Sequence, residues 1–113
     1  MNELLISMGH RLTARRKQLG LTQEELADRA GTTTQTISTA ETGRKALRPE
    51  NILKLCTALD ISADYLLRGT VSEEDIAILS TKMAGLTSTQ YRHLETIINS
   101  YVAAVLETAM AEV

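Results

Sequence analysis

Aromatic residues are almost missing from this sequence, which has no Trp, no Phe and only three Tyr among 113 residues. Hydrophobic residues nevertheless make up 43% of the chain, so any core must be built from aliphatic side chains. The sequence has a single Pro and no stretch that alternates apolar and polar residues, which argues against strands. The composition therefore predicts an all-α protein, long enough for one domain or for a small domain with an appendage.

Cysteine is equally scarce. The single residue, Cys56, excludes an intramolecular disulfide and any metal site made of several cysteines, and it fits a reducing compartment. Residues 1–7 are too few for a secretory signal and lack its basic start. No apolar run approaches the length of a membrane span. We therefore expect a soluble, cytoplasmic protein that does not contact a membrane.

Signatures of catalysis are missing as well. His10 and His93 are far apart in the sequence, and neither a Gly-rich phosphate loop nor a metal-ligand spacing is present. Neither histidine is therefore assigned a catalytic role. We expect a protein that is not an enzyme and that binds no metal and no cofactor.

The net charge of −2 argues, by itself, against a nucleic-acid binder, but the charge is unevenly distributed. Residues 1–69 carry +2, whereas residues 70–113 carry −4. The basic side chains gather in two segments, Arg11, Arg15, Arg16 and Lys17 in the first and Arg44, Lys45 and Arg48 in the second. The first part of the chain is therefore the candidate for binding a polyanion, and the second part is not.

The segment from Thr22 to Thr42 has the pattern of two short helices joined by a tight turn. Thr22 and Glu25 have the spacing of a capping box, and the helix that they start should end at Gly31. Thr33 can then cap a second helix that ends near Thr42. The inner face of this second helix carries Ile37, Ala40 and Glu41.

The residues at key positions of this segment resemble the helix-turn-helix of the Cro/C1-type (XRE-like) repressors. These residues are Gln23, Leu26, Ala27, Gly31, Ile37 and Glu41. The small Ala lets the helices cross closely, the Gly makes the turn, and Leu and Ile fill the angle between them. The resemblance continues through Gly43, Pro49, Leu55, Leu59 and the run Asp64–Leu67. It covers roughly residues 8–69 and implies a five-helix lambda-repressor-like DNA-binding domain, with residues 1–69 as its predicted extent.

The first helix, from about Leu4 or Met8 to Leu19, places Arg16 on its apolar stripe. A buried guanidinium needs a carboxylate partner. Glu41 is the natural partner, and the resemblance supports it because an Arg and a Glu commonly pair at these positions in the family. Two unrelated, exposed charges are the alternative.

The second helix of the motif is where a DNA sequence would be read. Its outward positions, which we predict to contact bases, are Thr34, Gln35, Ser38 and Thr39. Gln35 can make a bidentate pair with adenine, and threonine methyl groups can touch thymine methyl groups. On an isolated helix such residues would merely keep the face soluble, but the context of the motif favours readout.

A second set of residues is predicted to contact phosphates: Gln23, Arg11, Thr33, Arg44, Lys45 and Arg48. The resemblance assigns Gln23 to a phosphate at a helix N-terminus, where free N–H groups and the helix dipole attract anions. The alternative for the three cations after Gly43 is a solvated loop. Two positions depart from the family pattern. Ala40 replaces a larger apolar residue, so another side chain must fill that part of the core, and Thr42 replaces an Asn or a basic residue.

Residues 70–113 lie outside the resemblance and are predicted to form two helices, the first from Ser72 to about Ala84. The second begins after Thr87 or Ser88 and spans roughly 33 to 37 Å at the rise of an α-helix. Its apolar stripe is the predicted dimer interface and includes Leu94, Ile98, Tyr101, Val102, Val105 and Leu106, continuing through Ala109 and Met110. Because the stripe has no strict heptad, we expect an intertwined helical homodimer instead of a regular coiled coil. The alternative is that both helices fold back on the DNA-binding domain of the same chain.

Together, these features predict a repressor that binds a pseudo-palindromic operator in double-stranded DNA as a homodimer, with its two reading helices about 34 Å apart. Two other functions remain open. The protein could be an antitoxin, whose C-terminal helices sequester a toxin while the first domain represses the shared promoter. It could also be a sensor, whose C-terminal helices bind a small effector.

Overall fold

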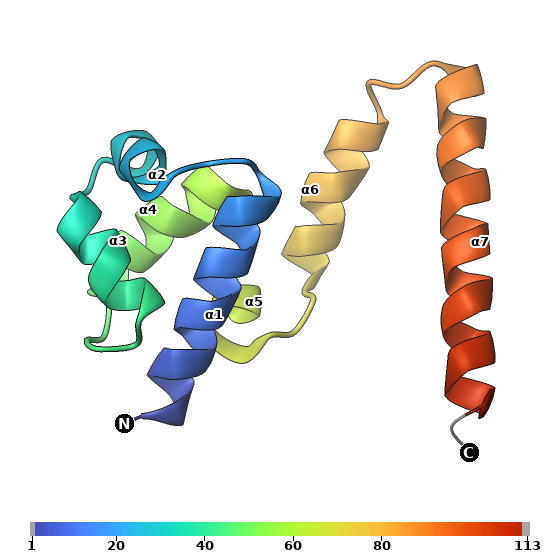
Figure 1. Ribbon diagram of the computed structural model, residues 1–113. Coiled ribbons are helices and arrows are strands. Elements are labelled where there is room, and N and C mark those ends of the chain that lie inside the picture. The colour runs from blue at the N-terminus through green and yellow to red at the C-terminus, as the bar shows by residue number, and fades with distance from the viewer. Residues whose placement is uncertain (1, 112–113) are drawn as a thin grey trace. The chain divides into compact units, whose positions relative to one another are not determined.

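Every regular element that the structure describes is a helix, which confirms the all-α prediction. The computed structural model describes residues 2–111, and side chains as far as residue 108. This range contains seven helices, whose arrangement can be followed in Figure 1. They are α1 (Glu3–Gln18), α2 (Gln23–Ala30), α3 (Thr34–Glu41), α4 (Pro49–Leu59), α5 (Ala63–Arg68), α6 (Glu73–Met83) and α7 (Ser88–Ala111).

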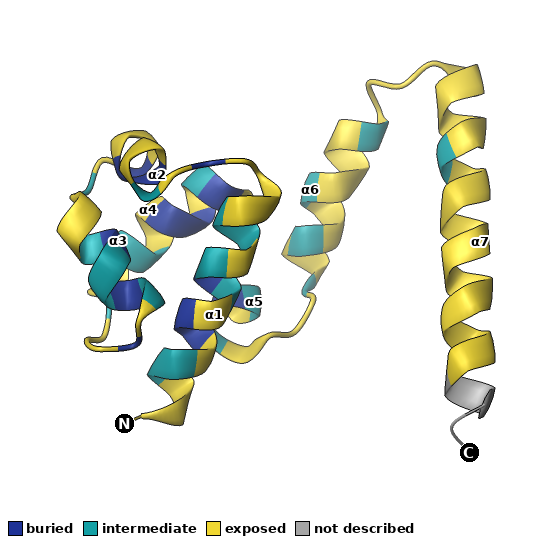
Figure 2. Ribbon diagram, in the orientation of Figure 1, coloured by how far each residue is buried: buried dark blue, intermediate teal, exposed yellow. Residues whose placement is uncertain are grey.

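The chain divides into two units, residues 1–78 and residues 79–113. In the first unit α1 packs against α3 and α5, α2 packs against α3 and α4, and α4 packs against α5. The core between them is aliphatic, as the composition predicts (Figure 2). Its most deeply buried side chains are Leu12, Leu26, Ile37, Leu55, Leu59 and Leu66.

The predicted helix pair α2 and α3 is confirmed, and local hydrogen bonds explain its ends. The Thr22 hydroxyl accepts from the N–H of Glu25, and the Glu25 carboxylate accepts from the N–H of Thr22, which completes the capping box. Gly31 has φ +70° and ends α2 in the left-handed conformation that glycine adopts without strain. Thr33 caps α3 by accepting from the N–H of Thr36.

The first helix begins at Glu3, next to Leu4, the earlier of its two predicted starts. The Asn2 side chain caps α1 by accepting from the N–H groups of Leu4 and Leu5. The helix ends at Gln18, with Leu19 as the C-terminal cap. Asn is a strong N-cap residue, so this start could have been found from the sequence.

Gly9 is the place where α1 approaches the end of α3. A Cβ atom at Gly9 would stand 2.7 Å from the carbonyl oxygen of Ala40 and closer still to that of Glu41. Glycine inside a helix normally costs stability relative to alanine. The close approach of the two backbones is the reason for a glycine at this position.

Gly9→Ala should therefore destabilise the protein, because the added methyl group meets backbone that cannot move aside. We expect the free energy of unfolding to fall by about 1 to 3 kcal/mol, the range for overpacking, as measured by chemical denaturation. Gly85→Ala is the control, because a Cβ there would lie an ordinary 3.7 Å from the Lys82 carbonyl oxygen. Equal stability of Gly9→Ala and the wild type would contradict the close approach.

The first unit includes the first turns of α6, as far as residue 78. The end of the DNA-binding domain at residue 69 stays a prediction. Asp75 caps α6 together with Ser72, as the sequence pattern predicts. Asp75 also accepts hydrogen bonds from Ser62, the residue that caps α5. This second set of bonds is not visible in the local sequence pattern.

The second unit consists of the last turns of α6, a short turn and α7. Thr87 caps α7 and forms a capping box with Gln90. Most residues of the apolar stripe are exposed in the described part of α7. Their exposed fractions lie between 42%, at Tyr91, and 70%, at Tyr101. The side chains of Ala109 and Met110 lie outside the described residues. Among the described residues, no helix combines the length and the apolar character that crossing a bilayer requires.

Candidate nucleic-acid interface

A buried ion pair joins α1 to the end of α3. The Arg16 Nε atom donates to Glu41 Oε2 at 2.6 Å, and Nη2 donates to Oε1 at 3.0 Å. The Arg16 side chain is 11% exposed and that of Glu41 is 6% exposed. The remaining Arg16 nitrogen donates to the carbonyl oxygen of Leu21, at 2.8 Å. The structure therefore brings together the two residues that the sequence analysis pairs, and it adds a link to the segment before α2.

Both members of the pair are held in their charged forms. Burial raises the pKa of the Glu41 carboxyl, but hydrogen bonds from Arg16 and Gln23 outweigh it, so the pKa lies below its ordinary value. The hydrogen bond with Glu41 raises the pKa of Arg16. Gln23 Nε2 donates to Glu41 Oε1 at 3.1 Å, so Glu41 also anchors the first turn of α2.

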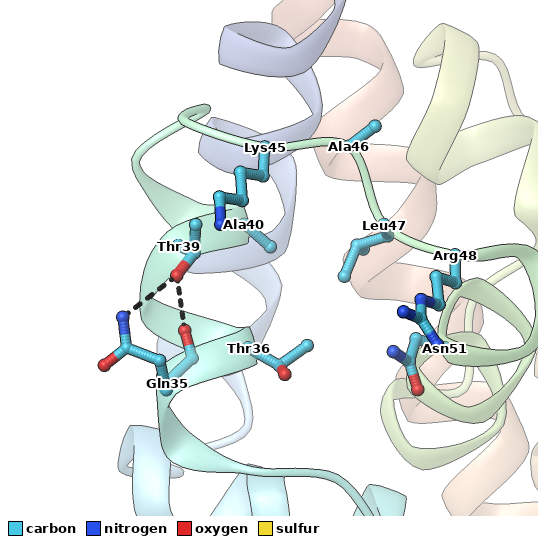
Figure 3. Close-up of a pocket in the computed structure, with 9 residues that line it drawn as sticks. All are labelled: Gln35, Thr36, Thr39, Ala40, Lys45, Ala46, Leu47, Arg48 and Asn51. Atoms are coloured by element: carbon cyan, nitrogen blue, oxygen red, sulfur yellow. Dashed lines mark hydrogen bonds between the residues drawn. The ribbon is translucent and has the colours of Figure 1, made fainter.

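The outward face of α3 carries the four predicted base-reading residues. Thr34 and Gln35 are exposed, whereas Ser38 and Thr39 are half-buried. Gln35 Nε2 donates to Thr39 Oγ1 at 3.3 Å, and Thr39 Oγ1 donates to the carbonyl oxygen of Gln35 at 2.6 Å (Figure 3). Gln35 and Thr39 therefore form one polar surface on this helix, and Thr34 precedes Gln35 at the first position of the helix.

A groove of about 220 Å³ separates α3 from the segment that leads into α4. Figure 3 shows side chains of α3 on one side of it and Leu47, Arg48 and Asn51 on the other, with Lys45 beside Thr39. Its lining residues are Gln35, Thr36, Thr39, Ala40, Lys45, Ala46, Leu47, Arg48 and Asn51. Two predicted phosphate-binding cations, Lys45 and Arg48, therefore line the groove beside the predicted base-reading surface.

Leu47 is the side chain that compensates for the small residue at position 40. Leu47 is half-buried and packs against the core. With Ala40 and Met8 it lines a void of only about 10 Å³, too small for a side chain. No role was predicted for Leu47 from the sequence. The sequence hints at this role only in that Leu47 is an apolar residue between the basic residues Lys45 and Arg48 of the loop.

Arg11, a predicted phosphate contact, makes hydrogen bonds within the fold. Its Nε atom donates to the carbonyl oxygen of Leu66 at 2.9 Å, and Nη2 donates to that of Leu67 at 3.0 Å. The last carbonyl groups of a helix lack hydrogen-bond donors within the helix. The Arg11 guanidinium supplies such donors at the end of α5. Arg11 is therefore a structural cap of α5, and its phosphate contact stays a prediction.

Arg15 caps another helix in the same way, because its Nε atom donates to the carbonyl oxygen of Leu59 at the end of α4, at 2.8 Å. Three of the four cations in the first basic segment, Arg11, Arg15 and Arg16, are therefore engaged within the fold. The exposed cations of the second segment are Arg44, Lys45 and Arg48. These three and the polar residues Gln23 and Thr33 remain as candidates for phosphate contacts.

Cys56 is buried in the core, and burial raises the pKa of its thiol to about 11, with smaller effects of Glu74 and Asp75. The thiol is therefore protonated and unreactive at neutral pH. His10 and His93 are both exposed. Among the described residues, no three His, Cys, Asp or Glu side chains lie together as they would around a metal ion.

The known proteins that this chain resembles match it over a segment that contains α2 and α3. The sequence model of a helix-turn-helix family matches residues 12–66. Repressor protein C2 of Salmonella phage P22 is 40% identical over 70 residues, which are 62% of this chain and 32% of that protein. An uncharacterised HTH-type transcriptional regulator of Methanothermobacter thermautotrophicus is 69% identical over 64 residues, 57% of this chain and 80% of that protein.

The fold of the first unit also has a solved counterpart. The crystal structure of the P22 c2 repressor in complex with a synthetic operator superposes with a TM-score of 0.54 at 41% identity. The superposition covers 56% of this chain and 96% of that one. This likeness confirms the predicted lambda-repressor-like fold. The chain spans about a third of the length of the curated phage repressor that it matches.

Proposed function

Since the chain belongs to the Cro/C1-type (XRE-like) helix-turn-helix family of non-enzymatic, DNA-binding transcriptional regulators, we propose that it represses transcription by binding a pseudo-palindromic operator as a homodimer. The observation that carries this proposal is the surface of α3. A short helix presents Thr34, Gln35 and Thr39 outward, while Glu41 at its far end is fixed by a buried arginine. Such a helix can enter the major groove as a rigid body.

Base readout is assigned to the outward residues of α3. A glutamine amide can both donate and accept, which suits the N6 and N7 atoms of adenine. The hydrogen bond between Gln35 and Thr39 supports this role, because it limits the rotation of the amide before DNA binds. Ser38, which is half-buried, and Thr34 complete the proposed set.

Phosphate contacts are assigned to residues on both sides of this surface: Gln23, Thr33, Arg44, Lys45 and Arg48. Gln23 lies at the N-terminus of α2 and Thr33 at that of α3, where backbone N–H groups attract anions. Lys45 and Arg48 line the groove beside α3. A DNA strand lying along the groove would meet positive charge while α3 contacts the bases.

Dimerisation is assigned to α7. Its exposed apolar residues recur at helical spacing, with Ile98, Val102 and Val105 on one face and Leu94 half-buried beside them. Large exposed apolar stripes mark interaction surfaces. A second copy of this chain is the proposed partner, because a two-fold dimer would place two α3 helices on one operator.

Two substitutions separate base readout from phosphate binding. Gln35→Ala should cost about 1 to 3 kcal/mol at one base pair of the operator and relax discrimination there. Arg44→Ala should weaken binding to all duplexes alike. It should also reduce the slope of log affinity against log salt concentration by about one unit. Titration of variant operators across a salt series measures both effects. Equal binding of the wild type to every duplex would contradict sequence-specific repression.

A second candidate function is that of an antitoxin, which the uncovered stripe of α7 also favours. In that case α7 would bind a toxin while α3 binds the promoter of the shared operon. A small protein that is encoded beside this gene and co-purifies with the full chain, but not with an Ile98→Glu variant, would favour this function.

A further inference from the structure

The three candidate phosphate-binding cations between α3 and α4 are attached to the fold in different ways. The N–H of Arg44 donates to the carbonyl oxygen of Thr39 at 3.1 Å, which attaches Arg44 to the last turn of α3. The carbonyl oxygen of Arg48 accepts from two N–H groups in the first turn of α4, at 2.9 and 3.0 Å. Lys45 lies between these two attachments, in the stretch of residues 45–47.

This stretch is attached to the fold by a side chain. Within the part of the chain that the structure describes, the backbone of residues 45–47 makes no hydrogen bond. Lys45 and Ala46 are exposed, whereas Leu47 is half-buried and packs against the aliphatic core. A backbone without hydrogen bonds loses conformational freedom only where its side chains pack. Leu47 therefore attaches the stretch to the core.

Lys45 and Leu47 lie against the same part of the core. Both line the void of about 10 Å³ beside Ala40 and Met8, so the two side chains are near each other. Both also line the groove along α3, where Figure 3 shows Lys45 beside Thr39. The packing of Leu47 on the core therefore determines where Lys45 enters the groove.

The small residue at position 40 explains why a loop side chain reaches the core at this point. Ala40 is buried at the end of α3 but leaves part of the core unfilled, and Leu47 fills it from the loop. A larger residue at position 40 would fill the same space from α3 itself. The exchange keeps the core packed, and it also joins the loop to α3.

We propose that Leu47 is a positioning residue for phosphate binding, which holds residues 45–47 against the core and thereby places the Lys45 ammonium group beside α3. This inference rests on the proposed function, since it requires Lys45 to contact a phosphate of the operator. Because Leu47 acts through Lys45, its contribution to affinity cannot exceed that of Lys45. The contribution should also be the same for every DNA sequence, since a phosphate contact carries no base information.

The test is a double-mutant cycle of Lys45→Ala and Leu47→Ala. Two duplexes are titrated, the operator selected from a random pool and a duplex of the same length with scrambled sequence. Lys45→Ala should weaken binding to both about three- to tenfold, and it should reduce the slope of log affinity against log salt concentration by about one unit.

Leu47→Ala should weaken binding to both duplexes by the same factor as Lys45→Ala or by a smaller one. The reason is that a loosened backbone must be ordered before Lys45 can bind, and this ordering costs free energy. The double variant should bind as Lys45→Ala does. The ratio of the affinities for the operator and the scrambled duplex should stay that of the wild type in all three variants.

Two controls separate positioning from a general loss of structure. Leu47→Met keeps an apolar side chain of similar volume and should bind like the wild type. Leu53→Ala removes the same side chain from a site on α4 that is 65% exposed, and it should also leave binding unchanged. Circular dichroism gives the folded fraction of each variant. If Leu47→Ala does not fold, Leu47→Val takes its place in the cycle, with the same pattern expected at smaller size.

Fully additive losses in the double variant, or a larger loss in Leu47→Ala than in Lys45→Ala, would overturn the proposal and leave the proposed repressor intact. The same holds if Leu47→Ala binds like the wild type while Lys45→Ala binds more weakly. A Lys45→Ala variant that binds like the wild type would overturn both the proposal and the phosphate contact assigned to Lys45.

Discussion

Glu41→Ala is expected to lower the free energy of unfolding by about 3 to 5 kcal/mol, the range for breaking one half of a buried ion pair. The substitution leaves the Arg16 guanidinium buried without its carboxylate, and it also removes the acceptor for Gln23. The cost therefore combines an unpaired charge with the loss of the contact between α2 and α3. Chemical denaturation of the full chain measures it.

The control for this variant is an ion pair of the same residue types on the surface. Arg92 donates to Glu95 at 3.1 Å, but the two side chains are 70% and 46% exposed. Exposed pairs contribute about 0 to 1 kcal/mol, so Glu95→Ala should change stability little. Equal stability losses in Glu41→Ala and Glu95→Ala would show that burial does not make the first pair different.

The same carboxylate gives the stability a dependence on pH whose sign follows from its lowered pKa. A carboxyl group with a lower pKa in the folded state contributes stability above its unfolded pKa, and this contribution is lost as the pH falls through the folded value. The difference in stability between the wild type and Glu41→Gln should therefore be constant near pH 7 and shrink in acid. A difference that grows as the pH falls would contradict an ionised Glu41 in the folded protein.

Truncation of the chain after Ile78 is expected to weaken operator binding between about one hundred- and ten thousand-fold, which is the usual gain from linking two binding modules. The truncated chain keeps Asp75 and the whole first unit. Its α3 should therefore still read one half-site, but two copies would have to bind independently. Titration of a full operator and of a single half-site, with circular dichroism to check folding, separates these effects.

A point variant tests the same dependence on dimerisation in the full-length chain. Ile98→Glu places a charge in the apolar stripe of α7 and should reproduce most of the loss. Ser100→Glu places the same charge on the opposite face of the helix and should leave binding unchanged. A truncated chain or an Ile98→Glu variant that remained dimeric and bound the operator at full affinity would contradict the role assigned to α7.

The helix-turn-helix could be predicted from the sequence because its signals are local. Thr22, Glu25, Gly31 and Thr33 each determine a helix end through bonds to neighbours within a few residues. Periodicity predicted Arg16 on a buried face, and burial of a cation requires an acid nearby. Glu41 was then the natural partner because it lies on the inner face of the adjoining helix.

The features that the sequence did not reveal depend on contacts between distant residues. Arg11 and Arg15 carry charges that seemed available to DNA, but each meets the end of a helix more than forty positions away. Gly9 is required only because the end of α3 passes beside it. The bonds from Asp75 to Ser62 are equally invisible, since the capping box with Ser72 already explains Asp75 locally.

Readout of one operator by two copies of α3 can be measured by selecting bound sites from a random pool of DNA duplexes. The full chain, used at a concentration where it is dimeric, should enrich inverted repeats whose half-site centres lie about 34 Å apart, one turn of the double helix. Selection with the Gln35→Ala variant should enrich the same repeats with one degenerate position in each half. Enrichment of a single unrepeated half-site, or of no sequence, would contradict readout of one operator by two copies of α3.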